Sequence, residues 1–196
     1  MQDFLELRFA LENTSSYLTY TSSTMSEWQF VSAIAERADV GLMFDVNNVY
    51  VSAYNHGFDP FAFIRQVPHQ RIVQVHLAGH TNLGDYIIDT HSGPVIEPVL
   101  DLYRELISIA GPVSTLIEWD DEIPDFPVLA AEAERVRRVR DEGLALGAAR
   151  RAGTAPPFVR PAWAARFDAP AAHGLERHPG GHKPWSQGGP REVAAE

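Results

Sequence analysis

The sequence predicts an α/β fold built on a parallel sheet. Over residues 1–146, short apolar runs alternate with amphipathic stretches, in the order β-α-β-α-β-α-β-α. A continuous apolar run such as Val40–Phe44 is typical of a parallel strand that is buried on both faces. A carboxylate or an imidazole follows four of these runs, at the strand ends where α/β proteins place their chemistry.

The first predicted unit begins with a strand over residues 8–11, which ends at Glu12. A helix is predicted over residues 25–38, because its apolar side chains repeat on one face. Thr24 and Glu27 have the spacing of a capping box, so they are expected to mark where this helix begins.

The second and third predicted strands cover residues 40–44 and 72–75, and they end at Asp45 and His76. The Asp-Val-Asn-Asn sequence that begins at Asp45 is rich in turn formers, which predicts a loop beyond that strand. A short helix is predicted over residues 60–66, before the third strand.

A long polar loop over residues 78–94 carries Asp89 and His91, and a helix over residues 95–109 follows it. The last unit pairs a short strand, residues 115–117, with a helix predicted from about Pro127 to Leu146. Glu118 stands at the end of that strand.

The 196-residue chain has two parts of different composition. Residues 147–196 contain 26 Gly, Pro or Ala residues out of 50 and carry a net charge of +3, which predicts a disordered tail. Residues 1–146 carry a net charge of −13, against −10 for the whole chain, and are expected to form one metal-binding domain.

Composition excludes several classes of protein. The chain has no cysteine, which excludes disulfide scaffolds, thiolate metal sites and cysteine nucleophiles. Its acidic balance argues against a nucleic-acid partner. No apolar run approaches the ~18 residues of a membrane span, and the start lacks a leader pattern, so we expect a cytoplasmic protein with no membrane contact.

The four strand-end residues are Glu12, Asp45, His76 and Glu118, and they are expected to converge at one end of the sheet. Anionic groups repel one another there unless a cation lies between them, so a metal site is predicted. Carboxylates and imidazoles without thiolates suit Fe(II), Mn(II) or Zn(II). Together with Asp89 and His91 the candidates exceed the needs of one ion, which favours two or three.

Each candidate also has an ordinary structural role when it is taken alone. Glu12 could pair with an arginine, and Asp45 and Asn48 could form a turn. A histidine after an apolar strand is often a hydrogen-bonded core residue, and Asp89 to His91 is an unremarkable loop sequence. Only their joint order along the strand ends indicates a ligand set.

Five motifs resemble a bacterial family of multinuclear-iron TIM-barrel proteins that includes the methanobactin-biosynthesis oxygenase. The resemblance implies a barrel of the xylose-isomerase-like type and extends over about residues 11–140. The motifs are LENTSSYL (11–18), FDVNNVYVSAYNHGFDP (44–60), VHLAGH (75–80), IIDTHSGPV (87–95) and LIEWDDEIP (116–124).

The resemblance also assigns ligands. Glu12, Asp45, His76 and Glu118 would hold one iron, and a second iron would be held by Asn48, Asp89 and His91. Asn48 departs from the related zinc-dependent endonucleases, which often have a histidine at that position. Asp120 is the candidate catalytic residue, as a group that orients a ligand or transfers a proton.

The activity implied by the resemblance is oxidative. The family binds two or three irons and uses dioxygen to oxidise a cysteine or a neighbouring position in a ribosomally made peptide, which a small partner protein usually presents. The alternatives are a Zn- or Mn-dependent hydrolase or isomerase without redox chemistry, and a non-catalytic remnant. His80 and Asn82 are expected to line the substrate mouth or to orient His76.

Only four βα units are predicted, whereas a full (β/α)₈ barrel needs about 250 residues. We therefore expect the C-terminal half of a barrel, with the first three strands of the family and two of its metal-binding histidines missing. Half a barrel leaves two sheet edges and an apolar face open. It is expected to be either a truncated copy or a chain that pairs with another half, including a second copy of itself.

Overall fold

The computed structural model describes residues 2–168, and in that range the chain forms an α/β structure around a four-stranded sheet. All strand pairs in this sheet are parallel, and the order is β1-β2-β3-β6. The predicted parallel α/β class is therefore confirmed, and four strands fit part of a TIM barrel. The strands are β1 (Ala10–Glu12), β2 (Gly41–Asp45), β3 (Ile72–Ala78) and β6 (Ser114–Glu118).

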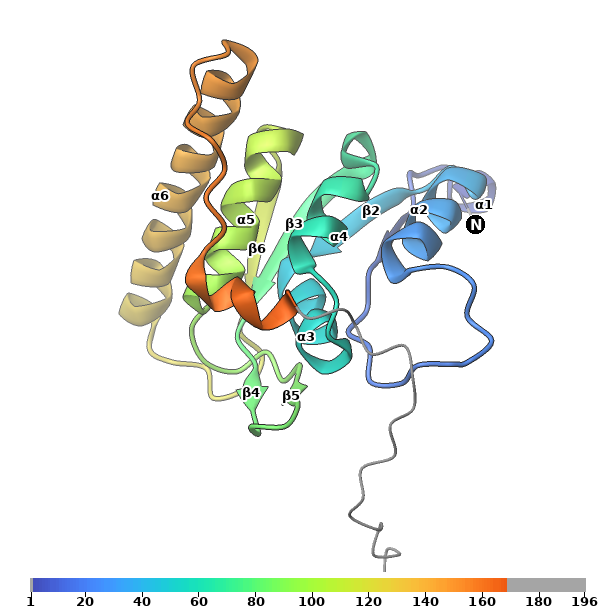
Figure 1. Cartoon of the computed structure of the whole chain (residues 1–196), viewed down its shortest axis with the longest axis horizontal. Coiled ribbons are helices and arrows are strands. Elements are labelled where there is room, and N and C mark those ends of the chain that lie inside the picture. Colours follow the sequence, from blue (N-terminus) through green and yellow to red (C-terminus); the bar gives the residue numbers. More distant parts are fainter. Residues whose placement is uncertain (1, 169–196) are drawn as a thin grey trace, which may run out of the picture.

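Helices line one side of this sheet, and α6 packs along α5 (Figure 1). A two-stranded antiparallel hairpin, β4 (Thr81–Asn82) with β5 (Ile87–Ile88), follows β3. The helices are α1 (Gln2–Leu5), α2 (Glu27–Arg37), α3 (Val46–His56), α4 (Pro60–Gln66), α5 (Glu97–Ala110) and α6 (Phe126–Arg151), with 3₁₀ turns η1 (His69–Arg71) and η2 (Ala162–Phe167).

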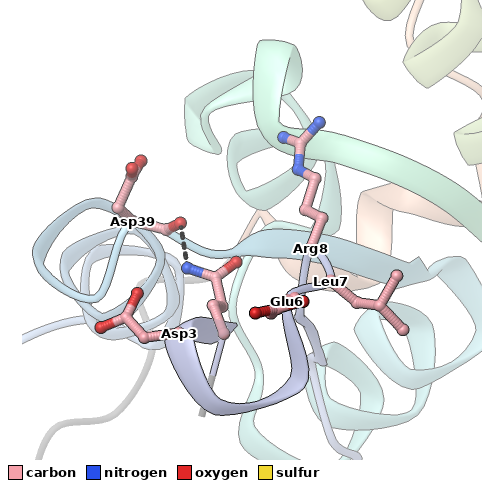
Figure 2. A pocket seen from close by; sticks show the side chains of 6 residues that line it. Asp3, Glu6, Leu7, Arg8 and Asp39 are labelled. Carbon is pink, nitrogen blue, oxygen red and sulfur yellow. Dashed lines mark hydrogen bonds between the residues drawn. The ribbon is translucent and has the colours of Figure 1, made fainter.

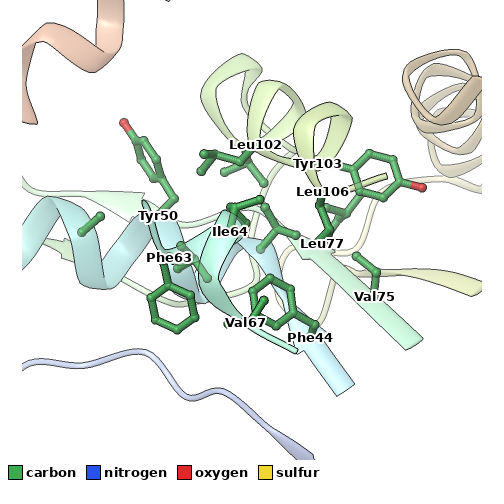
Figure 3. Packing of buried hydrophobic residues seen from close by; sticks show 14 of the residues in the cluster. Phe44, Tyr50, Phe63, Ile64, Val67, Val75, Leu77, Leu102, Tyr103 and Leu106 are labelled. Atoms are coloured by element: carbon green, nitrogen blue, oxygen red, sulfur yellow. The ribbon is translucent and has the colours of Figure 1, made fainter. Parts of the chain in front are cut away.

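The core lies between the sheet and the helices. Phe44 of β2 and Val75 and Leu77 of β3 are fully buried there, beside side chains from α4 and α5 (Figure 3). Side chains alternate along a strand, so their neighbours point to the opposite face. On that second face Leu116 is still 44% exposed, so the face is open to solvent.

The pairing of β2 with β3 contains a register shift. Leu42 lies opposite Ile72, but Met43 lies opposite Gln74, so Val73 is an extra residue on β3. Such a bulge restores the side-chain alternation that buries Ile72 on the same side as Val75. Beyond it, Asp45 lies opposite His76.

The predicted helix over residues 25–38 forms, but its predicted cap is wrong. Ser26 is the N-cap, and its side chain accepts the backbone N–H of Gln29, whose side chain accepts the N–H of Ser26 in return. The capping box therefore lies two residues after the predicted Thr24 and Glu27 pair. Gln29 serves because an amide oxygen completes the box as well as a carboxylate does.

The loop predicted after Asp45 is instead the 11-residue helix α3. Asp45 favours the helix because its side chain accepts the backbone N–H of Asn48 as an N-cap. Gly57 ends the helix with a φ of 74°, a left-handed conformation that glycine adopts easily. Eight of its residues are buried, so tertiary packing overrides their weak helix propensity.

The predicted disordered tail is wrong for residues 147–168. Helix α6 continues to Arg151, because Gly147 lets it approach the backbone of α5 closely at Ser108. Further on, Ala164 and Phe167 of η2 are buried. The rest of the predicted tail, residues 169–196, lies outside the described residues. In the described range, no helix has both the length and the apolar character to cross a membrane.

Candidate metal centre

Four side chains meet at the carboxyl ends of the four parallel strands. Each of Glu12, Asp45 and Glu118 is the last residue of its strand, and His76 lies level with Asp45 on β3. One ligand atom from each of the four residues lies within 4.8 Å of the other three. The convergence expected from strand-end positions is thus present.

His76 lies at the centre of this group and is almost fully buried. Its Nδ1 is 3.2 Å from Glu12 Oε1 and 3.1 Å from Glu118 Oε1. Its Nε2 is 3.2 Å from the side-chain oxygen of Gln74, which lies two residues earlier on the same strand. Acceptor oxygens on both sides therefore hold the ring in place between two carboxylates.

Asp45 is fully buried, and its two oxygens have different surroundings. Oδ1 accepts the N–H of Asn48 at 2.6 Å, whereas Oδ2 has no hydrogen-bond partner within the described residues. Burial raises the pKa of Asp45 well above its usual range, and the negative charges of Asp89 and Glu12 raise it further. A buried carboxylate oxygen without a donor is costly, so this position suits a cation.

A second group, formed by Asp89 and His91, adjoins the first. His91 Nε2 is 3.0 Å from Asp89 Oδ1, and His91 Nδ1 is 3.3 Å from Glu118 Oε2. Neither His91 Nε2 nor Glu118 Oε2 has a hydrogen-bond partner in the part of the chain that the structure describes. These atoms approach without hydrogen-bond geometry, and Glu118 contacts both His76 and His91.

Charge distribution follows from this geometry. Burial lowers the pKa of His91, but the charge of Asp89 and the hydrogen bond with Asp120 outweigh burial, so the pKa of His91 is raised. Burial raises the pKa of Glu118, and the two histidines partly oppose that rise. The site is therefore rich in carboxylates, and they raise the pKa of the neighbouring His91.

Asn48 and Asp120 both belong to the predicted site, but Asn48 is buried and Asp120 is exposed. Asn48 is 5% exposed, donates its side-chain N–H to the carbonyl of Asn13, and has an Oδ1 without a hydrogen-bond partner within residues 2–168. Its predicted grouping with Asp89 and His91 remains a prediction. Asp120 is 70% exposed, and its Oδ2 lies 3.2 Å from His91 Nδ1.

Two asparagines that were not predicted as site residues support the cluster. Asn13 exchanges two hydrogen bonds with the backbone of Asp45, at 2.8 and 2.9 Å. Asn47 donates to Asp89 Oδ1 at 2.8 Å. The sequence could have indicated both residues by their positions. Asn13 directly follows Glu12, and Asn47 lies two residues after Asp45, in the first turn of α3. His80, expected to line the substrate mouth or to orient His76, has its side-chain hydrogen bond with Asn47. Its place at a substrate mouth stays a prediction.

The donor set fits a metal ion of the Fe, Mn or Zn type. Carboxylates and imidazoles supply oxygen and nitrogen donors, and the unpartnered oxygens of Asp45 and Glu118 are the atoms that a cation would satisfy. The ligand atoms converge without any rearrangement of the strands. The role of the individual residues as ligands remains a prediction.

A separate hollow lies at the amino ends of β1 and β2, the opposite end of the sheet from this cluster. Gln2 is one of its lining residues and donates its side-chain N–H to the carbonyl of Asp39. Figure 2 shows Asp3, Glu6, Arg8 and Asp39 around this hollow. No group of metal-ligating side chains lies there among the described residues. The hollow is lined by Gln2, Asp3, Glu6, Leu7, Arg8 and Asp39.

Comparison with known proteins gives the family of this chain. Residues 1–141 match the model of a family described as "RiPP precursor modification enzyme MbnB/TglH/ChrH". The chain belongs to this family. RiPPs are ribosomally made, post-translationally modified peptides, so the family acts on peptide precursors. The resemblance inferred from the five motifs is confirmed.

Close relatives carry the name "UPF0276 protein", which states no activity. One from Anaeromyxobacter sp. (strain Fw109-5) is 48% identical over 145 residues, which cover 74% of this chain and 51% of the relative. Another, from Acaryochloris marina, is 46% identical over 135 residues, with 69% and 49% covered. The chain spans about half the length of the relatives that it matches.

Proposed function

We propose that this chain is part of an iron-dependent oxidase or oxygenase that modifies cysteine-containing, ribosomally made peptides. The observation that carries the proposal is the meeting of four donor atoms within 4.8 Å at the strand ends. Membership of a family of peptide-precursor modification enzymes supports the substrate class. The oxidative chemistry and the iron are the parts that go beyond these findings.

Two ion positions are proposed. Glu12, Asp45, His76 and Glu118 would hold the first ion, and Asp89 and His91, with Glu118 shared and Asn48 as a further candidate, would hold the second. When bound, iron would supply the electrons with which dioxygen is reduced. A carboxylate can bridge two ions, and Glu118 has one oxygen towards each histidine.

The protein residues would keep this site in one geometry. The N–H of Asn48 fixes one oxygen of Asp45, which leaves the other free for a cation. Gln74 orients the ring of His76 from behind. Asp120 accepts a hydrogen bond from Nδ1 of His91 and is open to solvent, so it would orient His91 and exchange a proton with water or substrate.

The partners belong to the same proposal. A peptide precursor would be the substrate, and its cysteine thiolate would approach the open side of the cluster, since the chain supplies no cysteine of its own. A small partner protein would present the peptide, and pairing with a second copy of the chain would cover the open sheet face. These expectations rest on the resemblance together with the family description.

A second candidate is a Zn- or Mn-dependent hydrolase or isomerase of similar architecture. The donor set favours it as much as it favours iron, because carboxylate and imidazole ligands suit all three metals. A third candidate is a remnant without catalysis. Metal content and metal identity separate the three.

The first test is metal analysis of the full chain purified without oxygen and supplied with Fe(II), Mn(II) or Zn(II) in parallel. We expect at least about one tightly held equivalent and a preference for iron. His76→Ala is the matched control, because it removes the central ligand. Less than about a tenth of an equivalent of every metal would contradict the enzyme proposal. A preference for zinc with no oxygen consumption would favour the hydrolase.

A further inference from the structure

A C-terminal strap, residues 154–168, returns from the end of α6 across the outer side of the helices (Figure 1). It follows the segment that matches the family, which ends at residue 141. Ala164 is completely buried and Phe167 is 6% exposed, so the strap is packed into the molecule. The strap is thus a feature of this chain that lies outside the family match.

Specific contacts hold the strap on α4 and α5. Trp163 donates its indole N–H to Asp101 at 2.8 Å, and its ring stacks on Phe61 with 5.6 Å between the ring centroids. Arg160 donates to Asp59, the N-cap residue of α4, at 2.9 Å. These contacts place the Trp163 ring in one orientation.

Tyr50 of α3 lies between the strap and the loop that follows β3. On one side its ring forms a T-shaped pair with Trp163, with 5.8 Å between the centroids, and on the other side it stacks on His80 at 5.4 Å. Tyr50 is 7% exposed. Because Trp163 and His80 pack on two sides of the Tyr50 ring, displacement of Trp163 would let Tyr50 move away from His80.

His80 connects this stack to the second metal group. Its Nδ1 lies 2.7 Å from Asn47 Oδ1, and Asn47 donates its side-chain N–H to Asp89 Oδ1 at 2.8 Å. Since the Asn47 amide nitrogen faces Asp89, its oxygen must accept from His80, which places the His80 proton on Nδ1. Burial lowers the pKa of His80 to about 4, so this neutral tautomer persists at neutral pH.

We infer that the strap fixes the orientation of the Asp89 carboxylate through the stacked rings and the Asn47 amide. Trp163, Tyr50, His80 and Asn47 are then positioning residues for the second ion. This inference rests on the proposed function in one respect, because it takes Asp89 as a ligand. It gives the strap a chemical role, since a rotated Asp89 would present the wrong oxygen to an ion held with His91.

The test compares Trp163→Ala and His80→Ala with Phe158→Ala. Phe158 also lies on the strap and packs on Phe61 and Arg65, but it has no ring contact with Tyr50, so it controls for loss of strap packing. The first measurement is the NMR signal of the Asn47 side-chain amide in the metal-free chain. The second is an oxygen-free titration with Fe(II).

Both Trp163→Ala and His80→Ala should shift the Asn47 amide signal and weaken the second Fe(II) equivalent at least about tenfold, with the first retained. Phe158→Ala should leave both unchanged. Trp163→Leu, which keeps apolar volume but lacks the ring, replaces Trp163→Ala if that variant does not fold. If the Trp163 variant matches Phe158→Ala in both measurements, the inference is wrong. If the wild-type chain binds no Fe(II) but the amide signal still moves, the proposed function fails and the coupling stands.

Discussion

Asp45 combines two tasks in one side chain. One oxygen caps α3 and the other is buried without a hydrogen-bond partner among the described residues. Burial raises its pKa well above the usual range, so its negative charge costs stability at neutral pH when no cation is present. A residue that weakens the metal-free fold and points at a shared centre is typical of a ligand rather than of a structural turn.

Asp45→Asn should therefore separate stability from metal binding. The amide oxygen of asparagine can still accept from Asn48, while the buried charge disappears. We expect a metal-free variant that is at least as stable as the wild type at pH 8, with Fe(II) affinity lowered by tenfold or more. Urea unfolding and metal titration measure the two effects. A variant that binds Fe(II) normally would show that Asp45 is only a helix cap.

His80 gives a prediction about pH. Its pKa is lowered from 6.5 to about 4 in the folded chain, so between these values the unfolded chain binds the extra proton and the folded chain does not. Stability should therefore fall as the pH is lowered from about 6.5 to 4, by on the order of 1–3 kcal/mol from this residue. Urea unfolding at several pH values should show a flatter profile for His80→Gln. Parallel profiles for the two proteins would contradict the assignment.

At the scale of elements, α3 concentrates the support of the site in its first turns. Asp45 caps it, Asn48 fixes Asp45, and Asn47 and Tyr50 lie on the route from the strap to Asp89. Helix α3 thus contacts the strap through Tyr50 and the cluster at the strand ends through Asp45 and Asn47.

The strands could be predicted from the sequence, but this helix could not. A short, continuous apolar run such as Val40–Phe44 is typical of a strand buried on both faces, so the local pattern was sufficient there. The Asp-Val-Asn-Asn stretch instead indicates a turn, since asparagine favours turns locally. The helix forms because Val46, Val49 and Ala53 are buried, and that burial depends on contacts with elements distant in the sequence.

The contact between α5 and α6 supplies a prediction at the same scale. A Cβ on Gly147 would lie 2.4 Å from the carbonyl oxygen of Ser108, which is backbone and cannot move away easily. Helix propensity alone predicts that Gly147→Ala gains about 1 kcal/mol, whereas overpacking predicts a loss of about 1–3 kcal/mol. We expect the loss in urea unfolding. Ala148→Gly, at an exposed position on the same turn, measures the propensity effect, and a gain for Gly147→Ala would refute the close approach.

At the scale of the whole molecule, the net charge of −10 and the acidic end of the sheet favour the binding of a cation at the proposed site. A metal that binds only the folded state stabilises it by about 2.7 kcal/mol at a hundredfold excess over Kd. For a chain of this size we expect Tm to rise by roughly 5–10 °C with Fe(II) or Mn(II) under exclusion of oxygen, and to return with a chelator. His76→Ala should show no such rise. An equal rise in that variant would place the metal elsewhere.

The sequence could predict the cluster at the strand ends but not the order of the C-terminal strap. The joint order of Glu12, Asp45, His76 and Glu118 along the strands predicted their convergence, because parallel strands end on the same side. The order of the strap was not predictable from its many proline and alanine residues. Its order comes from a few aromatic and arginine contacts, such as that of Trp163 with Phe61, and composition averages conceal these.

The extra residue on β3 has a consequence for anyone who edits or aligns this chain. Val73 lies outside the pairing, and beyond it Val75 and Leu77 face the helices while His76 lies opposite Asp45. Deleting this one valine, which is neither a ligand nor part of the buried core, would remove the bulge and leave Asp45 opposite His76. The strand therefore has one residue to spare ahead of its ligand, and a one-residue deletion there would leave every donor on its own face of the sheet.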